Sequence, residues 1–347
     1  MKPAILLILL TLLLSCRHSD RIMSFYYWRT TYALHPLESA AIRDNHVPVL
    51  YIRYFDVDQP PGQPRPSPVS PITFNTPLPN IRIIPVIFIR NRVFEQIANT
   101  DSTNAAPDSV SRNDIGSLAQ NILKLSTDIS AAQNQHPDTI QFDCDWTEKT
   151  KNAFFSFLDK YRRISGQSIT CTIRLHQVKY PGRTGIPPVD KGILMYYNIG
   201  AIDAGNGNSI YTPATAARYI PSLPAYPLQL DIALPIFTWG LQIRDGKVIG
   251  LLNKMNFQHF ENDTNFTRAN DGRFRAIAAG FKGGYYFKPG DLVKIEHVDA
   301  DALENIAADI RKYSNHRLHN IIFYDLDVAN LRLYDKKDLQ KVLDRFD

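Results

Sequence analysis

Cysteine is scarce in this sequence. Of only three cysteines, Cys16 follows a short apolar run near the start of the chain, which leaves Cys144 and Cys171 for the folded body. Their spacing matches no zinc-binding cysteine pattern. Both lie inside apolar runs of the strand type. Export would permit a disulfide between neighbouring strands, but two buried free thiols are favoured.

Runs of basic residues are also absent. The formal net charge is +5 over 347 residues, and Lys and Arg alternate with acids, which argues against a nucleic acid partner. Histidines at metal-binding spacing are lacking, with Glu296-His297 only a weak candidate. The glycine-rich stretch 280–290 lacks the strand-turn-helix context of a phosphate-binding loop. We therefore predict no metal site and no cofactor, and the sequence does not indicate an oligomeric state.

One long apolar run is present, at residues 4–14, and it is too short to span a bilayer as a helix. Lys2 precedes it and Leu13-Leu14-Ser15-Cys16 closes it. This ending resembles the lipobox of bacterial lipoproteins, which implies that Cys16 becomes the lipidated first residue of the mature chain. An ordinary signal peptide that ends near a cysteine is the alternative.

The resulting domain prediction has three parts: a signal peptide at 1–15, a tether at 16–24 and a single domain at 25–347. The expected location is the bacterial cell envelope, facing the periplasm or the cell surface, with the membrane as a partner through the lipid anchor.

Strand-like segments rich in β-branched and aromatic residues recur along the body, with helical periodicity in several of the gaps. Eight strands are predicted, at 47–58, 81–89, 139–145, 168–176, 192–198, 228–237, 292–297 and 320–327. The aromatic segment 25–28 is either a first core strand, which we favour, or an exposed binding patch. The pattern predicts an α/β fold, a (β/α)8 TIM-like barrel with some irregularity.

Helices are predicted at 114–129, from about 148 to Gly166, near 214–220 and at 300–313, with Thr147 as a candidate cap of the second. The proline-rich stretch 59–79 is interpreted as a loop that makes a harmless excursion. The stretch 250–290 is too irregular to assign.

The segment Ile140-Gln141-Phe142-Asp143-Cys144-Asp145-Trp146-Thr147-Glu148 is the centre of the functional prediction. Carboxylates two residues apart on a strand point to the same face, so Asp143 and Asp145 can interact and raise one pKa. Cleavage of a glycosidic bond needs such an acid. Alternatively, these acids neutralise the buried charge of Arg90 or Arg174.

In a barrel, the carboxyl ends of all strands meet on one face. Residues far apart in the sequence are therefore expected to be neighbours there: Asp56, Arg90, Asp143, Asp145, His176, Tyr197, Asp231, Trp239, Glu296 and Asp325, with Trp146 and Arg174 beside them. Carboxylates, guanidinium groups and aromatic faces together are typical of sugar recognition. His176 is more often a structural residue than a proton shuttle in such a place.

Three segments, at 142–146, 194–198 and 231–240, resemble landmarks of chitinase-type family-18 glycoside hydrolases. The resemblance implies a barrel that uses the substrate's acetamido group as nucleophile. It also implies an acid catalyst two residues after the last Asp, where this chain has Thr147; Glu148 lies one position further. Over most of its body the chain is also similar to an uncharacterised bacterial lipoprotein family, domain of unknown function 3142, through segments 27–29, 140–145, 168–170 and 175–177.

Three functions follow as alternatives. In glycoside hydrolysis, Asp143 and Asp145 would be the acid and assisting pair, Tyr197 would hold the substrate, Trp239 would stack against it and Glu296 would be an alternative acid. Because Thr147 replaces the expected acid, the protein is alternatively a glycan-binding barrel without catalysis. In the third alternative it is a scaffold lipoprotein whose acids balance Arg53, Arg90 and Arg174.

Overall fold

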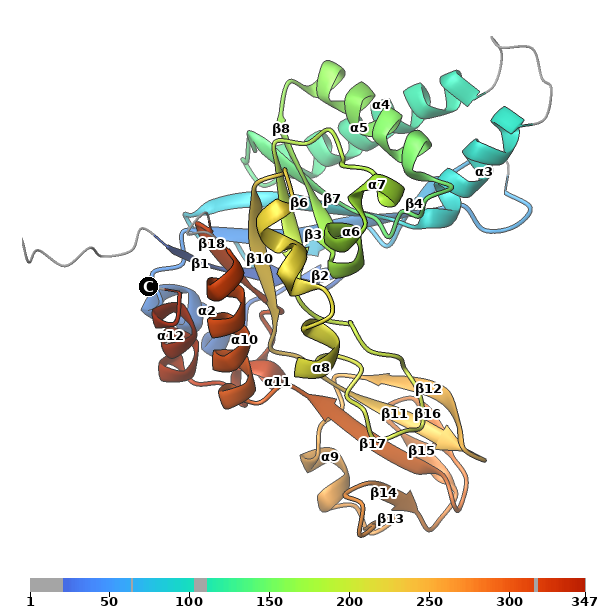
Figure 1. Cartoon of the computed structure of the whole chain (residues 1–347), viewed down its shortest axis with the longest axis vertical. Coiled ribbons are helices and arrows are strands. Elements are labelled where there is room, and N and C mark those ends of the chain that lie inside the picture. The colour runs from blue at the N-terminus through green and yellow to red at the C-terminus, as the bar shows by residue number, and fades with distance from the viewer. Residues whose placement is uncertain (1–20, 64, 103–110, 315–317, 347) are drawn as a thin grey trace, which may run out of the picture.

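The computed structural model describes residues 21–63, 65–102, 111–314 and 318–346 (Figure 1). The predicted signal peptide, the lipobox and most of the predicted tether therefore lie outside the described residues. The first strand begins at Ile22, so the folded body starts within the stretch that was predicted as tether.

Eight parallel strands form a closed barrel. In barrel order they are β1 (Ile22–Tyr27), β3 (Val49–Asp58), β6 (Arg82–Ile89), β7 (Thr139–Asp143), β8 (Ser168–Arg174), β9 (Lys191–Met195), β10 (Leu230–Pro235) and β18 (Asn320–Tyr324). The barrel closes because β1 pairs with both β18 and β3. The predicted (β/α)8-type barrel is confirmed, and the aromatic segment that begins at Phe25 belongs mainly to a core strand.

Helices cover the outside of the barrel. They are α2 (Pro36–Asp44), α3 (Asn91–Ser102), α4 (Ser111–Ala131), α5 (Lys151–Ser165), α6 (Leu175–Lys179), α7 (Pro181–Thr184), α8 (Pro213–Ala216), the 3₁₀-helix η2 (Ile220–Ala225), α10 (Ala300–Tyr313), α11 (Val328–Leu331) and α12 (Lys336–Asp344). Helix α5 shows the underlying pattern: Phe154, Phe157 and Tyr161 recur at helical spacing and are fully buried. Gly166 ends this helix with a φ of 67°, as predicted.

A second, antiparallel sheet is inserted between β10 and β18. Its strands follow the order β12 (Lys247–Asn253), β11 (Thr238–Arg244), β17 (Leu292–His297), β14 (Phe274–Ala276) and β13 (Phe266–Arg268). The insert also contains α9 (Gln258–Glu261) and the hairpin β15 (Gly280–Lys282) and β16 (Tyr285–Phe287), and it extends to one side of the barrel (Figure 1). The prediction that 292–297 is a barrel strand is wrong, because β17 pairs only within this sheet and β1 is the eighth barrel strand.

The proline-rich stretch 59–79, which was interpreted as a loop, contains two short strands. Its strand β4 (Ser67–Val69) pairs antiparallel with the last residues of β3, and β5 (Thr73–Phe74) pairs with β2 (Thr31–Tyr32). Arg53 donates a hydrogen bond from Nη1 to the carbonyl oxygen of Ser70 over 3.0 Å. The stretch is therefore fixed beside the carboxyl end of β3.

Both body cysteines, Cys144 and Cys171, are buried free thiols, as predicted. Among the helices that the structure describes, none combines the length and the apolar character needed to cross a membrane.

Candidate functional site

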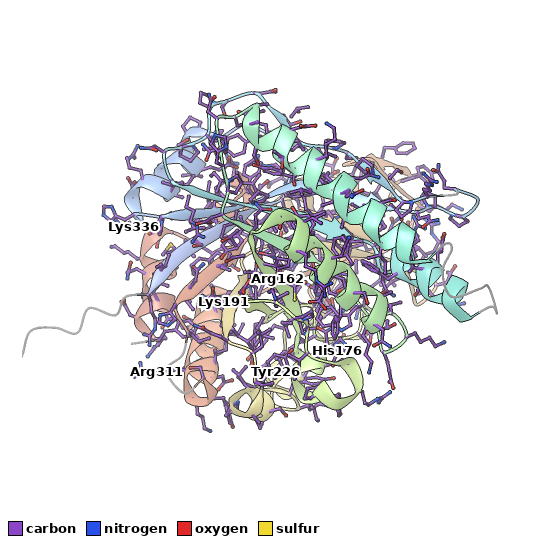
Figure 2. The ribbon with its side chains drawn as sticks, turned by 90° about the horizontal axis from the view of Figure 1, so that it is seen from above. Arg162, His176, Lys191, Tyr226, Arg311 and Lys336 are labelled. Carbon is purple, nitrogen blue, oxygen red and sulfur yellow. The ribbon has the colours of Figure 1, made fainter. Side chains whose placement is uncertain are left out.

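The barrel mouth holds a pocket of about 400 Å³. The residues that line it are Asp145, Arg174, Leu175, His176, Tyr197, Asn198, Ile199 and Tyr219. Most of them follow the carboxyl ends of β7, β8 and β9, where parallel strands direct their connecting loops. His176 in α6, directly after β8, and Lys191 at the start of β9 can be located in Figure 2.

Asp143 is the last residue of β7 and is 5% exposed. Its Oδ1 accepts a hydrogen bond from Thr172 Oγ1 over 2.7 Å. Burial raises the pKa of Asp143 to about 6, while Arg174 lowers the pKa and Asp145 raises it. The predicted acid with a raised pKa is therefore present, but the main cause is burial and the neighbouring carboxylate contributes less.

Asp145 lies past the strand end, and its side chain is 54% exposed. Arg174 donates a hydrogen bond from Nε to Asp145 Oδ1 over 2.7 Å. Burial disfavours the charged form of Arg174, yet its pKa is raised because the carboxylates of Asp145 and Asp143 outweigh this cost. Asp143 and Asp145 thus have different environments: one is buried without a salt bridge among the described residues, and the other is held by an arginine at the pocket.

The alternative in which acids neutralise arginines applies to some of the predicted residues. Arg53 Nε lies 2.7 Å from Asp56 Oδ1. Arg90, which is half exposed, pairs with Asp58 over 3.2 Å and not with Asp56. In each of these two pairs and in Asp145–Arg174 the two charges balance each other. Among the described residues Asp143 has no such ion pair, so this alternative does not explain it.

Aromatic side chains lie beside the buried acid. Tyr197 is 2% exposed, and its hydroxyl has no hydrogen-bond partner among the described residues. Its ring stacks on that of Tyr324, with centroids 5.4 Å apart and an interplanar angle of 26°. Trp28 and Phe237 contact Tyr324 at centroid distances of 5.7 and 5.6 Å. Burial raises the pKa of both tyrosines well above its usual value, so both hydroxyls are neutral donors.

Trp28 and Tyr324 were not predicted as site residues. Both are only partly buried, unlike Tyr26, which is 1% exposed. The signal was their position at or just beyond the carboxyl ends of β1 and β18, the same criterion that selected Asp143. For the aromatic segment 25–28 a core strand was favoured over an exposed binding patch; the segment divides, because Phe25, Tyr26 and Tyr27 are buried in β1 and Trp28 follows the strand end.

Asp325 follows β18 and is a second buried acid at this end of the barrel. Burial raises its pKa to about 6, against the opposing effect of Lys254. Asn330 Nδ2 donates a hydrogen bond to Asp325 Oδ1 over 2.7 Å. Asp143 and Asp325 both raise the pKa of Tyr197 through their charge, so two buried carboxyl groups lie near the stacked tyrosines.

The prediction that Asp231 belongs to the mouth is wrong. It is the second residue of β10 and lies at the amino ends of the strands, where Lys191 Nζ approaches its Oδ2 to 3.1 Å. The backbone N–H of Asn320, at the start of β18, also donates a hydrogen bond to it. Burial is the main cause of its raised pKa. Only residues at the carboxyl end of a barrel strand reach the mouth, and Asp231 lies in the first half of both the predicted strand 228–237 and the observed strand.

Trp146 has a structural environment. It is 2% exposed, its Nε1 donates to the carbonyl oxygen of Thr184 over 3.0 Å, and its ring stacks on Phe154 at 5.2 Å. Its side chain therefore packs against α5 and does not line the mouth pocket.

Trp239 and Glu296 lie on β11 and β17 of the insert, so their predicted position at barrel strand ends is wrong. Trp239 Nε1 donates to Glu296 Oε2 over 2.9 Å, and Lys294 Nζ lies 2.7 Å from Glu296 Oε1. Ser209 also contacts the Glu296 carboxylate. With exposures of 8% and 3%, both side chains are held inside the protein.

Two further predictions near β7 and β8 need correction or refinement. Helix α5 has Thr150 as its N-cap, so Thr147 is not the cap; Thr147 is exposed and its N–H donates to Thr150 Oγ1 over 2.9 Å. Glu148 pairs with Arg183 over 3.2 Å.

His176 belongs to the first turn of α6, where burial and the charge of Arg174 lower its pKa, so it is a neutral imidazole in the wall of the pocket.

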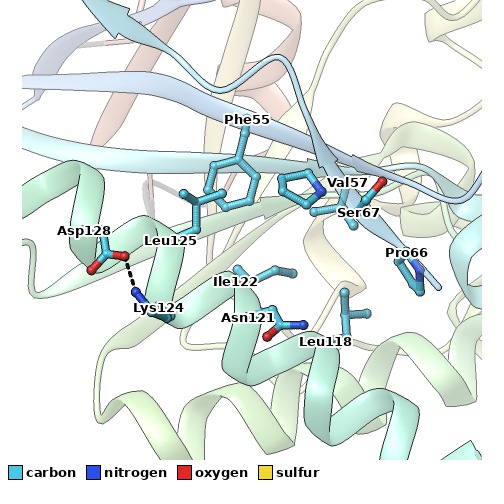
Figure 3. A pocket seen from close by; sticks show the side chains of 11 residues that line it. Phe55, Val57, Pro66, Ser67, Leu118, Asn121, Ile122, Lys124, Leu125 and Asp128 are labelled. Atoms are coloured by element: carbon cyan, nitrogen blue, oxygen red, sulfur yellow. Dashed lines mark hydrogen bonds and ion pairs between the residues drawn. The ribbon is translucent and has the colours of Figure 1, made fainter.

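A second hollow lies between α4 and the proline-rich stretch (Figure 3). It has a volume of about 310 Å³ and a mainly apolar lining that includes Phe55, Leu118 and Ile122; Lys124 and Asp128 form an ion pair there. It lacks the strand-end acids of the mouth. Over the described ranges, His, Cys, Asp and Glu side chains form no group of three suited to a metal ion.

Of the comparisons with known proteins, only the comparison of folds found matches. No family model matches, and no curated protein matches. Among solved structures, the spore cortex-lytic enzyme SleL of Bacillus cereus matches with a TM-score of 0.51 and 12% identity, over 94% of this chain and 74% of that one.

Two other solved structures match with lower scores. A xylanase and α-amylase inhibitor protein from Scadoxus multiflorus has a TM-score of 0.45 and 13% identity, over 93% of this chain and 98% of that one. A thermostable chitinase domain from Pyrococcus furiosus, solved with chito-oligosaccharides, has a TM-score of 0.42 and 8% identity, over 94% and 96%. The match to the cortex-lytic enzyme shows the fold alone, a closed barrel of parallel strands flanked by helices.

Proposed function

We propose that the barrel mouth binds a glycan. The observation that carries this proposal is the Tyr197 hydroxyl, which is buried at the edge of the pocket and has no hydrogen-bond partner within the part of the chain that the structure describes. A buried hydroxyl without a partner is costly unless a ligand or water satisfies it. The exposed Asp145 carboxylate and the Arg174 guanidinium offer an acceptor and donors for sugar hydroxyls, and Trp28 and Tyr324 offer aromatic faces for a pyranose ring.

Glycoside hydrolysis is the second candidate, and Asp143 favours it. A carboxyl group with a pKa of about 6 retains a proton near neutral pH, and protonation of the glycosidic oxygen requires such a group. In this scheme Asp143 supplies or exchanges the proton and Asp145 assists, as the sequence predicted. The barrel of the cortex-lytic enzyme is compatible with this chemistry, while Thr147 in place of the expected acid favours binding alone.

We also propose that the protein is an exported bacterial lipoprotein anchored through Cys16, similar to the family with domain of unknown function 3142. The apolar run 4–14 and the Leu13-Leu14-Ser15-Cys16 ending support this. Metabolic labelling with a clickable fatty acid tests it: wild type should incorporate label and Cys16→Ser should not. Equal labelling of the two would contradict lipidation at this residue.

The binding proposal is tested with the dimers and hexamers of chito- and manno-oligosaccharides, measured by calorimetry on the full-length chain carrying Cys16→Ser. Tyr197→Phe should weaken binding by about three- to tenfold, since one hydrogen bond is worth roughly 1 kcal/mol. Tyr226→Phe is the matched control, because Tyr226 also has a buried hydroxyl without a partner but does not line the pocket. If the chain carrying Cys16→Ser alone binds none of these oligosaccharides, the proposal is contradicted.

Hydrolysis is tested by release of reducing ends from the same hexamers. Asp143→Asn should abolish release and leave binding intact, because the amide keeps the shape of the side chain and cannot supply a proton. If the wild-type mouth binds oligosaccharides but releases no reducing ends, and Asp145→Asn leaves binding intact, the hydrolytic candidate is excluded and the glycan-binding function remains.

A further inference from the structure

One side of the mouth pocket carries two tyrosine rings with a lysine between them. Tyr219, which directly precedes η2, lines the pocket. Tyr180, which directly follows α6, is 44% exposed. Lys179 Nζ lies 5.4 Å from the centroid of each of these two rings. Tyr180 therefore belongs to a surface that continues from the pocket through Tyr219 and Lys179.

Arg218 adds a second positive charge to this surface. Its side chain is exposed, and its Cζ lies 5.9 Å from the centroid of the Tyr219 ring. Lys179 Nζ donates a hydrogen bond to the carbonyl oxygen of Arg218 over 2.7 Å, which joins α6 to the segment before η2. We call Lys179, Tyr180, Arg218 and Tyr219 together the basic rim of the pocket.

Neither positive charge of the basic rim has a carboxylate partner among the described residues. The neighbouring carboxylates are already paired: Asp145 with Arg174 in the pocket, and Glu148 with Arg183 on α7. Each of these ion pairs balances its own charges. The pocket and its rim together therefore carry an excess of positive charge, which comes from the rim.

We propose that the glycan bound at the mouth is acidic, with a carboxylate-bearing sugar unit held at the basic rim; this rests on the proposed glycan-binding function. The rings of Tyr180 and Tyr219 offer faces for a pyranose, and Lys179 and Arg218 offer charged donors for its carboxylate. A neutral glycan leaves both cations without a partner, so charge complementarity favours the acidic class.

An anionic membrane surface would also attract two cations, but it fits the position of the rim less well. The described chain enters the barrel at Ile22, whose N–H donates to the carbonyl oxygen of His319 at the amino ends of the strands. The proposed lipid on Cys16 would hold that end of the barrel near the membrane. The basic rim lies at the opposite end, since α6 directly follows the carboxyl end of β8.

Matched pairs of ligands test the charge of the glycan. They are chito- and manno-hexamers, and the same hexamers with their primary hydroxyls at C6 oxidised to carboxylates. Calorimetry on the full-length chain carrying Cys16→Ser should show about three- to tenfold tighter binding of the oxidised form at low salt, because two exposed ion pairs are added. This ratio of affinities should shrink in about 0.5 M sodium chloride, which screens exposed charges.

Three double variants locate the effect. Lys179→Gln combined with Arg218→Gln should lower the ratio of affinities to about one, whereas Lys179→Arg combined with Arg218→Lys keeps both charges and should keep the ratio. Lys336→Gln combined with Lys337→Gln is the control and should keep the ratio. It removes the same charge from exposed positions of α12, and Lys336 lies on the other side of the molecule from His176 (Figure 2).

The outcomes separate the basic rim from the mouth. If neutral hexamers bind and their oxidised forms bind no more tightly, or if the Gln double variant keeps the ratio, the acidic class is refuted and the mouth site stands. If the Gln double variant instead loses co-sedimentation with phosphatidylglycerol vesicles while the ratio is unchanged, the rim is a membrane contact and the proposal is overturned. If neither form of either hexamer binds, the rim and the proposed function fail together.

Discussion

The hydroxyl of Thr172 on β8 donates a hydrogen bond to Oδ1 of Asp143 on the neighbouring strand β7, over 2.7 Å. A neutral hydroxyl favours the carboxylate far less than an arginine does, and burial acts in the opposite direction. Asp145, in contrast, is exposed and held by Arg174. The two acids are two residues apart in the sequence, yet their surroundings differ: Asp143 is buried with a raised pKa, and Asp145 is exposed and paired with an arginine.

The pKa of Asp143 predicts how stability depends on pH. Its folded pKa is about 6 against an ordinary value of 3.8, so the folded state binds the proton more tightly than the unfolded state. The stability gained from protonated Asp143 is fully present below about pH 4 and is lost as the pH rises through about 6. In chemical denaturation at a series of pH values, Asp143 should contribute a fall of on the order of 2–3 kcal/mol in the free energy of unfolding over this range.

Asp143→Asn should flatten this dependence in part, because the amide does not ionise. It should not remove it, since burial also raises the pKa of Asp325 to about 6. The double variant with Asp325→Asn should have the flattest profile between pH 4 and 6. If the double variant and wild type have the same slope between pH 4 and 6, neither carboxyl group has the raised pKa.

Arg174→Gln should change both the site and the buried acid. Arg174 lowers the pKa of Asp143, so its loss should shift the Asp143 titration to higher pH, measurable by carbon-13 NMR of the carboxyl groups. Glycan binding should weaken at the same time, because Asp145 loses the partner that orients it. Arg90→Gln is a suitable control: it removes an arginine from the Asp58 pair and should leave the Asp143 titration unchanged.

Much of the barrel could be predicted from the sequence because its strands are buried on both faces. Ile232, Ala233 and Leu234 are consecutive in β10 and all fully buried, and such continuous apolar runs are characteristic of parallel strands. The assignment of 292–297 failed because Leu292–His297 has the same composition but pairs antiparallel with β11. Composition indicates that a segment is a strand, but the sheet that the strand joins is determined by contacts with residues distant in the sequence.

The site was predictable where the strand end was clear, as at Asp143, and not where a residue's direction depended on tertiary packing. Trp146 immediately follows Cys144 and Asp145, yet its ring turns to Phe154 on α5. Asp231 follows only one strand residue in β10. The predicted strand 228–237 also placed it in its first half, so Asp231 should not have been counted among the strand-end residues.

We expect Glu296 to contribute to the stability of the fold and not to oligosaccharide binding. It is buried with Lys294, whose Nζ also donates to the carbonyl oxygens of Gly205 and Gly207. Removing one partner of a buried pair leaves the other charge unpaired, so Lys294→Met should lower the free energy of unfolding by about 3–5 kcal/mol. Glu296→Gln should also reduce stability, while oligosaccharide binding at the mouth by the folded fraction is unchanged. Lost binding by fully folded Glu296→Gln protein would instead return Glu296 to the site.

Thr147→Glu tests whether the absence of an acid at position 147 is what prevents hydrolysis. Thr147 is exposed and is not the cap of α5, so a glutamate is accommodated there with little effect on stability, as thermal unfolding can verify. The family-18 resemblance implies a proton donor at this position. If the mouth otherwise holds a glycan in a reactive geometry, the added carboxyl group should raise the release of reducing ends from hexamers by at least about tenfold, the usual lower range for general acid catalysis being roughly a hundredfold.

Thr147→Gln is the control for this gain, because it has nearly the same shape as glutamate and cannot donate a proton as a carboxylic acid does. Release by the Glu variant alone, and its loss when Asp143→Asn is added, would mean that Asp143 already assists in a site that lacks only its donor. Intact binding with no release by the Glu variant would instead mean that the barrel holds glycans in a geometry unsuited to cleavage, since the donor would then be present without effect.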